Sequence, residues 1–142
     1  MANQFPTQIL ETIQIWTTEG NEYLYSDDPT RISDLEHFLQ TQQYDVSGKL
    51  YRRTDYEPIL NARKGDEIHL ERISSWSTDV EICNAKYENM ISVLLVLEDT
   101  VVSGLDVAEL SSYPHESEVL LAGVRLRVLN RVNDVLQVGL CE

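Results

Sequence analysis

The chain has 142 residues, which is enough for one domain with a substantial core and too few for two ordinary domains. Its apolar fraction of 42% is typical of a globular chain. The 24 acidic and 11 basic residues give a net charge of −13, which repels nucleic acid and anionic lipid. We therefore expect neither as a partner, and we expect any protein partner to have a basic surface. The alternative is that the charge serves only solubility.

Cysteine and histidine usage argues against a metal site. The two cysteines, Cys83 and Cys141, form no C-x-x-C motif, and the three histidines are scattered at His37, His69 and His115. The first residues lack the basic and apolar segments of a signal peptide, and no apolar run approaches the roughly 20 residues of a membrane span. We expect a soluble cytoplasmic protein that binds no metal.

Residues 1–47 have a helical pattern. Apolar residues recur at near-helical spacing in a first segment, and Asp28-Pro29 begins a second one. The two stripes contain Ile9, Ile13, Ile15 and Trp16 in the first segment, and Ile32, Leu35, Phe38 and Leu39 in the second. We interpret both stripes as core or as the cover of a core, and we assign them no chemistry.

Residues 48–142 read mainly as strands. Strand candidates lie at 50–52, 67–74, 91–97, 119–129 and 135–140, with a helical turn at 56–62 and a helix from Asp79 to about Tyr87. The alternation in 67–74 slips phase near its end. Helices followed by strands indicate a single α+β domain over residues 1–142, with antiparallel pairing.

Two glutamates stand two residues apart at the start of a strand-like run, at Glu116 and Glu118. In a strand both carboxylates would point to one face, roughly 6.6 Å apart along it. That spacing fits one carboxylate on a sugar and the other on an incoming group. The alternative is the solvated acidic face of a half-buried strand, since alternation is the usual pattern of antiparallel strands.

Two upstream motifs favour the first interpretation. Arg52 lies on a strand candidate, and Ser75 and Ser77 form an S-x-S motif on another one. The ordered set of arginine, S-x-S and E-x-E resembles the mono-ADP-ribosyltransferases of the R-S-E class, over about residues 48–140. Residues 111–121 also resemble that family's substrate-recognition loop running into its catalytic strand.

The resemblance implies an enzyme that uses NAD as a substrate and needs no metal. Breaking the bond between ribose and the cationic nicotinamide passes through a transition state that resembles an oxocarbenium ion. Glu118 would stabilise that charge and hold a ribose hydroxyl. Glu116 would orient the acceptor and take its proton, and family members with glutamate at this place usually modify arginine.

The resemblance also implies roles for the other motif residues. Arg52 would bind the NAD phosphates, because a guanidinium matches phosphate oxygens bidentately. Ser75 would position Glu118 and the nicotinamide ribose, with Ser77 beside it on NAD, and Tyr113 would contact the target protein. Simpler interpretations stay open: a surface ion pair for Arg52, a turn serine for Ser75, and a lid over the domain's own core for Tyr113.

Three departures from the family pattern are visible. Arg53 stands where the family often has glycine, so either arginine could hold NAD, and we choose Arg52 because it follows the aromatic residue and keeps the register. Trp76 stands where the S-x-S motif commonly has threonine, and a regular strand would point it to the opposite face as a core residue. Cys83 and Tyr87 lie near the places of an alanine and a nicotinamide-clamping phenylalanine, with imperfect spacing, so we do not transfer that role.

The resemblance implies two roughly perpendicular antiparallel sheets with the NAD cleft between them, and a short helical portion on one side. It implies transfer of ADP-ribose to a protein, and the small, acidic, unsecreted chain is more like a phage-encoded effector in the host cytoplasm than an exported toxin. Two alternatives are an NAD glycohydrolase toxin and a catalytically silent protein that binds and blocks a basic host protein. A glycosidase with paired acids fits less well, because it has no need for the arginine and S-x-S strands.

Overall fold

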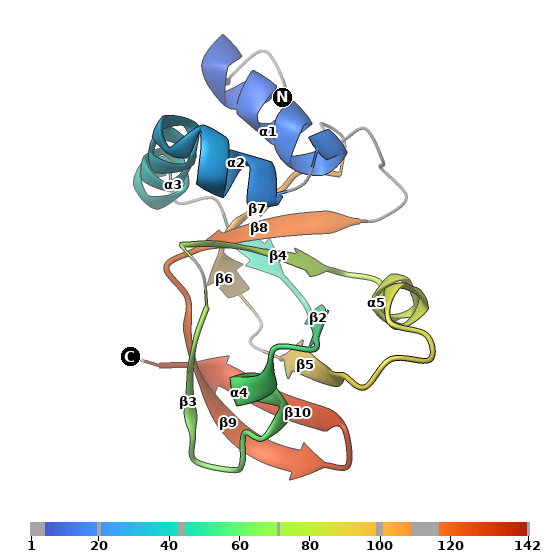
Figure 1. The fold of residues 1–142 in the computed structure, drawn as a ribbon. Coiled ribbons are helices and arrows are strands. Elements are labelled where there is room, and N and C mark those ends of the chain that lie inside the picture. The colour runs from blue at the N-terminus through green and yellow to red at the C-terminus, as the bar shows by residue number, and fades with distance from the viewer. Residues whose placement is uncertain are drawn as a thin grey trace.

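The N-terminal helices lie together at one end of the molecule, against strands β7 (Leu105–Asp106) and β8 (Glu118–Ala122) (Figure 1). They are α1 (Thr7–Glu19), α2 (Asn21–Asp27) and α3 (Pro29–Gln42). The computed structural model describes residues 5–19, 21–42, 45–70, 72–98, 101–108 and 117–141. The helical portion therefore falls within the predicted range 1–47, with α2 as a short helix that the pattern did not separate from its neighbours.

The two predicted apolar stripes are buried as expected. On α1 the buried residues are Ile9, Ile13 and Trp16, while Ile15 is half-buried. On α3 all four residues of the predicted stripe are buried, and Pro29 stands in the first turn, where a missing N–H costs nothing. Leu24 of α2 is fully buried between them. The helices thus form a core of their own with one face of the sheet.

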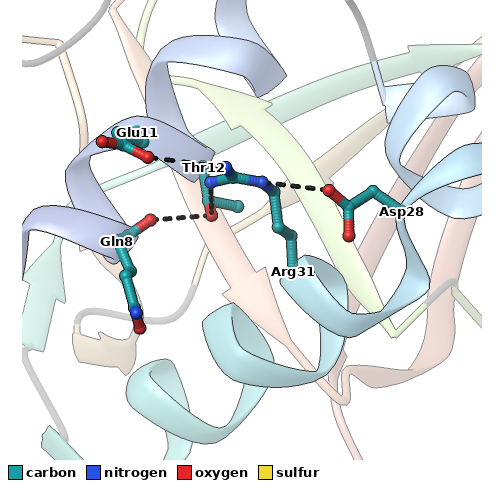
Figure 2. Close-up of polar contacts among 5 residues, drawn as sticks. All are labelled: Gln8, Glu11, Thr12, Asp28 and Arg31. Carbon is teal, nitrogen blue, oxygen red and sulfur yellow. Dashed lines mark hydrogen bonds and ion pairs between the residues drawn. The ribbon is translucent and has the colours of Figure 1, made fainter.

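Arg31 of α3 joins this helix to α1 (Figure 2). Its Nη1 donates to Thr12 Oγ1 at 3.3 Å, its Nη2 lies 3.4 Å from Glu11 Oε2, and its Nε lies 3.0 Å from Asp28 Oδ2. The Thr12 hydroxyl, which is almost fully buried, in turn donates to the Gln8 carbonyl at 2.9 Å. The contacts satisfy a buried hydroxyl and fix the angle between the two helices.

The remaining elements are mostly short strands. In chain order they are β1 (Asp45–Ser47), β2 (Leu50–Thr54), α4 (Glu57–Leu60), β3 (Glu67–His69), β4 (Ile73–Ser77), α5 (Val80–Lys86), β5 (Val93–Leu97), β6 (Val101–Ser103), β7 (Leu105–Asp106), β8 (Glu118–Ala122), β9 (Arg125–Val132) and β10 (Val135–Leu140). The α+β class is confirmed.

The expectation of two perpendicular antiparallel sheets is not confirmed. Within the described residues, eight strands form one continuous sheet in the order β3-β9-β10-β5-β2-β4-β8-β7, beside a small β1–β6 pair. The sheet is continuous because β2 pairs with β5 along its whole length and with β4 through Tyr51 and Ser77. It is mixed rather than antiparallel, because β10 and β5 run parallel.

The predicted strand 67–74 is in fact two strands with different partners. β3 pairs with β9 at one end of the sheet, whereas β4 pairs with β8 under the helices (Figure 1). The phase slip in the sequence marks the passage between them. The predicted strand 119–129 is likewise divided, because Gly123 has a φ of 63° and separates β8 from β9.

The phase of β4 and β8 divides their side chains between two cores. Trp76, Val119 and Leu121 point into a core with strands β2, β5, β9 and β10. Ile73 and Leu120 point to the opposite face, into the core that the helices cover. Because side chains alternate along a strand, this division decides which face every other residue of β4 and β8 occupies.

Candidate active site

The S-x-S motif and the second glutamate of E-x-E lie on one face of two paired strands. Strand register places Ser77 opposite Glu118 and Ser75 opposite Leu120. Residues directly opposite each other in an antiparallel pair share a face. Ser75, Ser77 and Glu118 therefore face the helical side, as Leu120 does. Trp76 faces the other core and is 2% exposed, which confirms the prediction for it.

The Glu118 carboxylate is held by two donors. The Ser75 hydroxyl donates to Glu118 Oε2 at 2.5 Å, and Trp16 Nε1 donates to the same oxygen at 3.0 Å. Glu118 is 9% exposed, so its carboxylate is buried and takes these donors in place of water. Within the described part of the chain, no residue bonds to the other carboxylate oxygen, Oε1.

Arg52 lies beside this pair. Its Nη1 donates to the Ser75 backbone carbonyl at 3.1 Å. Strand β2 thus places a guanidinium at Ser75, whose hydroxyl donates to Glu118. Arg52 is half-buried on its strand. The three predicted residues Arg52, Ser75 and Glu118 are thus linked by consecutive hydrogen bonds, from β2 through β4 to β8.

Arg53 is directed elsewhere. Its Nε donates to Asn84 Oδ1 at 3.1 Å, and its Nη1 contacts Ser92 Oγ at 3.0 Å and Asp134 Oδ2 at 3.2 Å. These partners belong to α5, the segment before β5, and the β9–β10 turn. Of the two arginines, Arg52 is therefore the one that contacts Ser75, and it does so through the Ser75 backbone carbonyl.

Ser77 serves the turn at the end of β4. Its hydroxyl oxygen accepts from the Asp79 backbone N–H at 3.0 Å, and Asp79 Oδ1 then caps α5 by accepting from Glu81 N at 2.9 Å. The predicted cap at Asp79 is confirmed, and α5 ends near the predicted position. Ser77 is 6% exposed, and its contact with NAD stays a prediction.

The extended geometry expected for the E-x-E pair does not continue through its middle residue. Ser117 has a φ of 51°, and β8 begins only at Glu118. A non-glycine residue in the left-handed region is uncommon. The two-residue strand spacing therefore does not give the distance between the carboxylates. Glu116 and Tyr113 lie outside the described residues, and their roles stay predictions.

Trp16 is the site residue that the sequence pattern did not reveal. It was assigned to the apolar stripe of α1, and its ring does lie in the helical core, 4% exposed. Its Nε1 nevertheless reaches Glu118, 102 residues away in the chain. A tryptophan in a buried stripe signals a donor that needs a partner, but helical periodicity does not say which one.

In the described ranges, no group of three or more histidine, cysteine or acidic side chains is arranged to hold a metal ion. Cys83 and Cys141 are not joined in a disulfide. None of the helices described is long and apolar enough to cross a membrane.

The chain is similar to known proteins at the level of solved structures. No protein-family model matches the chain, and no curated protein matches it. Among solved structures, it is similar to the C3 exoenzyme of Clostridium limosum, with a TM-score of 0.71 at 12% identity over 98% of this chain and 87% of that one. For the type III effector XopAI of Xanthomonas axonopodis pv. citri, the TM-score is 0.69 at 20% identity, over 99% and 69% of the two chains.

A third similar structure is Vis toxin, an ADP-ribosyltransferase from Vibrio splendidus. Its TM-score is 0.63 at 20% identity, over 95% of this chain and 72% of that chain. Similarity at these identities establishes architecture. The protein therefore has the fold of the ADP-ribosyltransferases.

Proposed function

We propose that the protein transfers ADP-ribose from NAD to an arginine side chain of a target protein. The observation that carries the proposal is the linked set of Arg52, Ser75 and Glu118 on three neighbouring strands. These residues were singled out from the sequence as an ordered motif, and they meet in a fold that ADP-ribosyltransferases share.

Glu118 is assigned the central role. Transfer breaks the bond between C1 of the ribose and the nicotinamide nitrogen, and the bonding electron pair neutralises the charged ring as it leaves. Positive charge then develops on the ribose, and a fixed carboxylate stabilises it. Ser75 and Trp16 both hold Oε2, so Oε1 is the oxygen we assign to the ribose.

Arg52 is assigned to the phosphates of NAD. It shares Ser75 with Glu118, so a dinucleotide bound at Arg52 would place its ribose near the carboxylate. A guanidinium donates two parallel hydrogen bonds to phosphate oxygens, which fixes orientation as well as position. Orientation of this kind contributes much of an enzyme's advantage in group transfer. Ser77 is the further NAD contact that we propose, on the face of β4 that also carries Ser75.

The acceptor is assigned from chemistry. An arginine guanidinium keeps its proton at neutral pH, so its attack on ribose C1 needs a base. We assign that base to Glu116: a nitrogen of the acceptor bonds to C1, and its proton passes to the Glu116 carboxylate. One solved structure of Vis contains agmatine, which carries the guanidinium group of an arginine side chain. Tyr113 is the proposed contact with the target protein.

The partner is proposed from charge. A net charge of −13 favours a target with a basic surface, because opposite fields speed encounter. We extend the proposal to an effector that acts on such a protein in the cytoplasm of a host cell, as a phage-encoded protein would.

The test is to incubate the protein with NAD labelled in its adenylate portion, once with agmatine and once with a cell lysate. Label on agmatine or on a discrete protein, with release of nicotinamide, would support transfer to a guanidinium. Free ADP-ribose without a labelled acceptor would instead favour an NAD glycohydrolase with water as acceptor. Intact NAD in both incubations would contradict the enzyme assignment and favour a silent binding protein.

A further inference from the structure

Glu118 is connected to the helical portion of the chain as well as to the sheet. Trp16, on α1, donates its indole N–H to Glu118 Oε2 at 3.0 Å. The oxygen is the one that accepts from Ser75, so two donors from two different elements converge on it. α1 therefore reaches into the candidate active site with one atom.

The indole ring is fixed by its surroundings. Trp16 is 4% exposed in the helical core, and Tyr25 of α2 lies edge-on to it, with ring centroids 6.2 Å apart. The Tyr25 hydroxyl accepts from the Ile73 N–H and donates to the Ile73 carbonyl, both at 3.1 Å, where β4 begins. The helical portion thus contacts the first residue of β4 and the first residue of β8. These contacts hold the indole N–H of Trp16 in place relative to Glu118.

A hydrogen bond from a buried donor favours the ionised form of a carboxylate. Glu118 is itself 9% exposed, so protein donors rather than water must partner its carboxylate. Removing one of the two donors at Oε2 should weaken the hold on the carboxylate and remove one hydrogen bond to its ionised form. A protonated Glu118 could not stabilise positive charge on a ribose.

We propose that Trp16 is a positioning residue that holds the Glu118 carboxylate oriented toward the substrate ribose. This inference rests on the proposed function for its catalytic meaning, whereas the effect of Trp16 on Glu118 is a property of the protein without substrate. It makes the N-terminal helices part of the active site rather than only a cover for the sheet.

The first test is Trp16→Phe, which keeps an aromatic ring in the core and removes the donor. A hydrogen bond to a charged group is worth enough to shift a titration by about one pH unit. The acid limb of the pH–rate profile should therefore move about one unit higher, since activity requires ionised Glu118. At pH values below the acid limb, Trp16→Phe should have about tenfold less activity than wild type. At pH values well above the limb, the loss of activity should be small.

The chain offers a matched control in Trp76→Phe. Trp76 is equally buried and also donates one indole hydrogen bond, to Ser74 Oγ at 2.9 Å, but it lies in the other core. Trp76→Phe should lower stability without moving the acid limb. Where Trp16→Phe fails to fold, benzothienylalanine at position 16 keeps the size of the indole and lacks its N–H.

A second readout does not need activity. The titration of the Glu118 side-chain carboxyl can be followed by carbon NMR without NAD, with the resonance assigned by its loss in Glu118→Gln. The titratable groups on the elements around it, such as Glu11 on α1, Tyr25 on α2, Arg52 on β2, Asp79 after β4 and Asp106 on β7, are the same in both proteins. The comparison of wild type with Trp16→Phe therefore isolates the indole bond.

The outcomes separate the two proposals. A Glu118 titration that moves upward in Trp16→Phe and stays in place in Trp76→Phe supports the inference. An unmoved titration in folded Trp16→Phe overturns it, even for an active enzyme. A wild-type protein that leaves NAD intact contradicts the proposed function, and the NMR titration still decides whether the Trp16 hydrogen bond acts on Glu118.

Discussion

Ser75 and Glu118 lie on paired strands but are not register partners. Ser75 is opposite Leu120, and Glu118 is opposite Ser77, yet the Ser75 hydroxyl donates to Glu118 Oε2 at 2.5 Å. The contact is diagonal, between residues of one face that are two positions apart in register. It directs the Glu118 carboxylate along the sheet toward Ser75, the residue whose carbonyl holds Arg52.

Replacing Ser75 with alanine should remove one of the two donors to the carboxylate. A hydrogen bond to a charged group is worth about 1.5–3 kcal/mol, which corresponds to a loss of about 10- to 100-fold in kcat/KM. The rate of nicotinamide release per folded molecule measures it. Ser74→Ala is the matched control, because the Ser74 hydroxyl bonds to Trp76 on the other face. Equal losses in the two variants would contradict the role of Ser75.

The two neighbouring arginines should separate into different functions. Arg52→Ala should raise KM for NAD by about tenfold or more, because it removes the proposed phosphate ligand. Arg53→Ala should instead lower the free energy of unfolding by about 1–2 kcal/mol, because its side chain is 15% exposed and bonds to Asn84, Ser92 and Asp134. Steady-state kinetics and urea unfolding measure the two effects. A larger rise in KM for Arg53→Ala would reverse the assignment.

Gly104 should not tolerate a side chain. A Cβ there would lie 2.9 Å from the Leu120 carbonyl oxygen and would also meet the Leu121 side chain, so β8 would have to shift. We expect Gly104→Ala to cost about 1–3 kcal/mol of stability and to lower activity by displacing Glu118, which begins that strand. Urea unfolding measures the cost.

Gly139 provides the control for that substitution. A Cβ at Gly139 would approach only the Leu129 side chain, at 3.2 Å, and Leu129 is largely exposed and free to move aside. Gly139→Ala should therefore lower the free energy of unfolding by clearly less than Gly104→Ala does. If both variants unfold at the same denaturant concentration as wild type, the close packing of Gly104 against β8 is contradicted.

The sequence predicted that three candidate residues converge, and its local patterns predicted the burial around them. The apolar stripe of α3 and the alternation around Trp76 predict which side chains are buried. Because Trp76 is buried on one face of β4, Ser75 must lie on the opposite face. The order of the motifs predicted that Arg52, Ser75 and Glu118 meet. The sequence left Arg52 and Arg53 both open, because strand alternation places them on opposite faces but does not say which of them reaches Ser75.

Features that depend on distant partners could not be predicted in the same way. The continuity of the sheet rests on the pairing of Tyr51 with Ser77, and the parallel β10–β5 pair joins segments whose patterns say nothing of direction. The sequence pattern predicts only a core role for Trp16, because helical spacing indicates which face of the helix is buried. It does not indicate which acceptor the indole N–H bonds to. The left-handed Ser117 is invisible to alternation.

The most direct test of the central claim compares Glu118→Gln with wild type in NAD cleavage and in transfer to agmatine. Glutamine keeps the shape of the side chain and removes the charge that the developing ribose cation needs. Glu57→Gln, at an exposed position on α4, removes the same charge elsewhere and serves as the control.

We expect Glu118→Gln to lose at least about 100-fold in both reactions, while Glu57→Gln keeps wild-type rates and both variants stay folded. A folded Glu118→Gln protein that cleaves NAD and labels agmatine at the wild-type rate would contradict the assignment of Glu118, and with it the proposed mechanism.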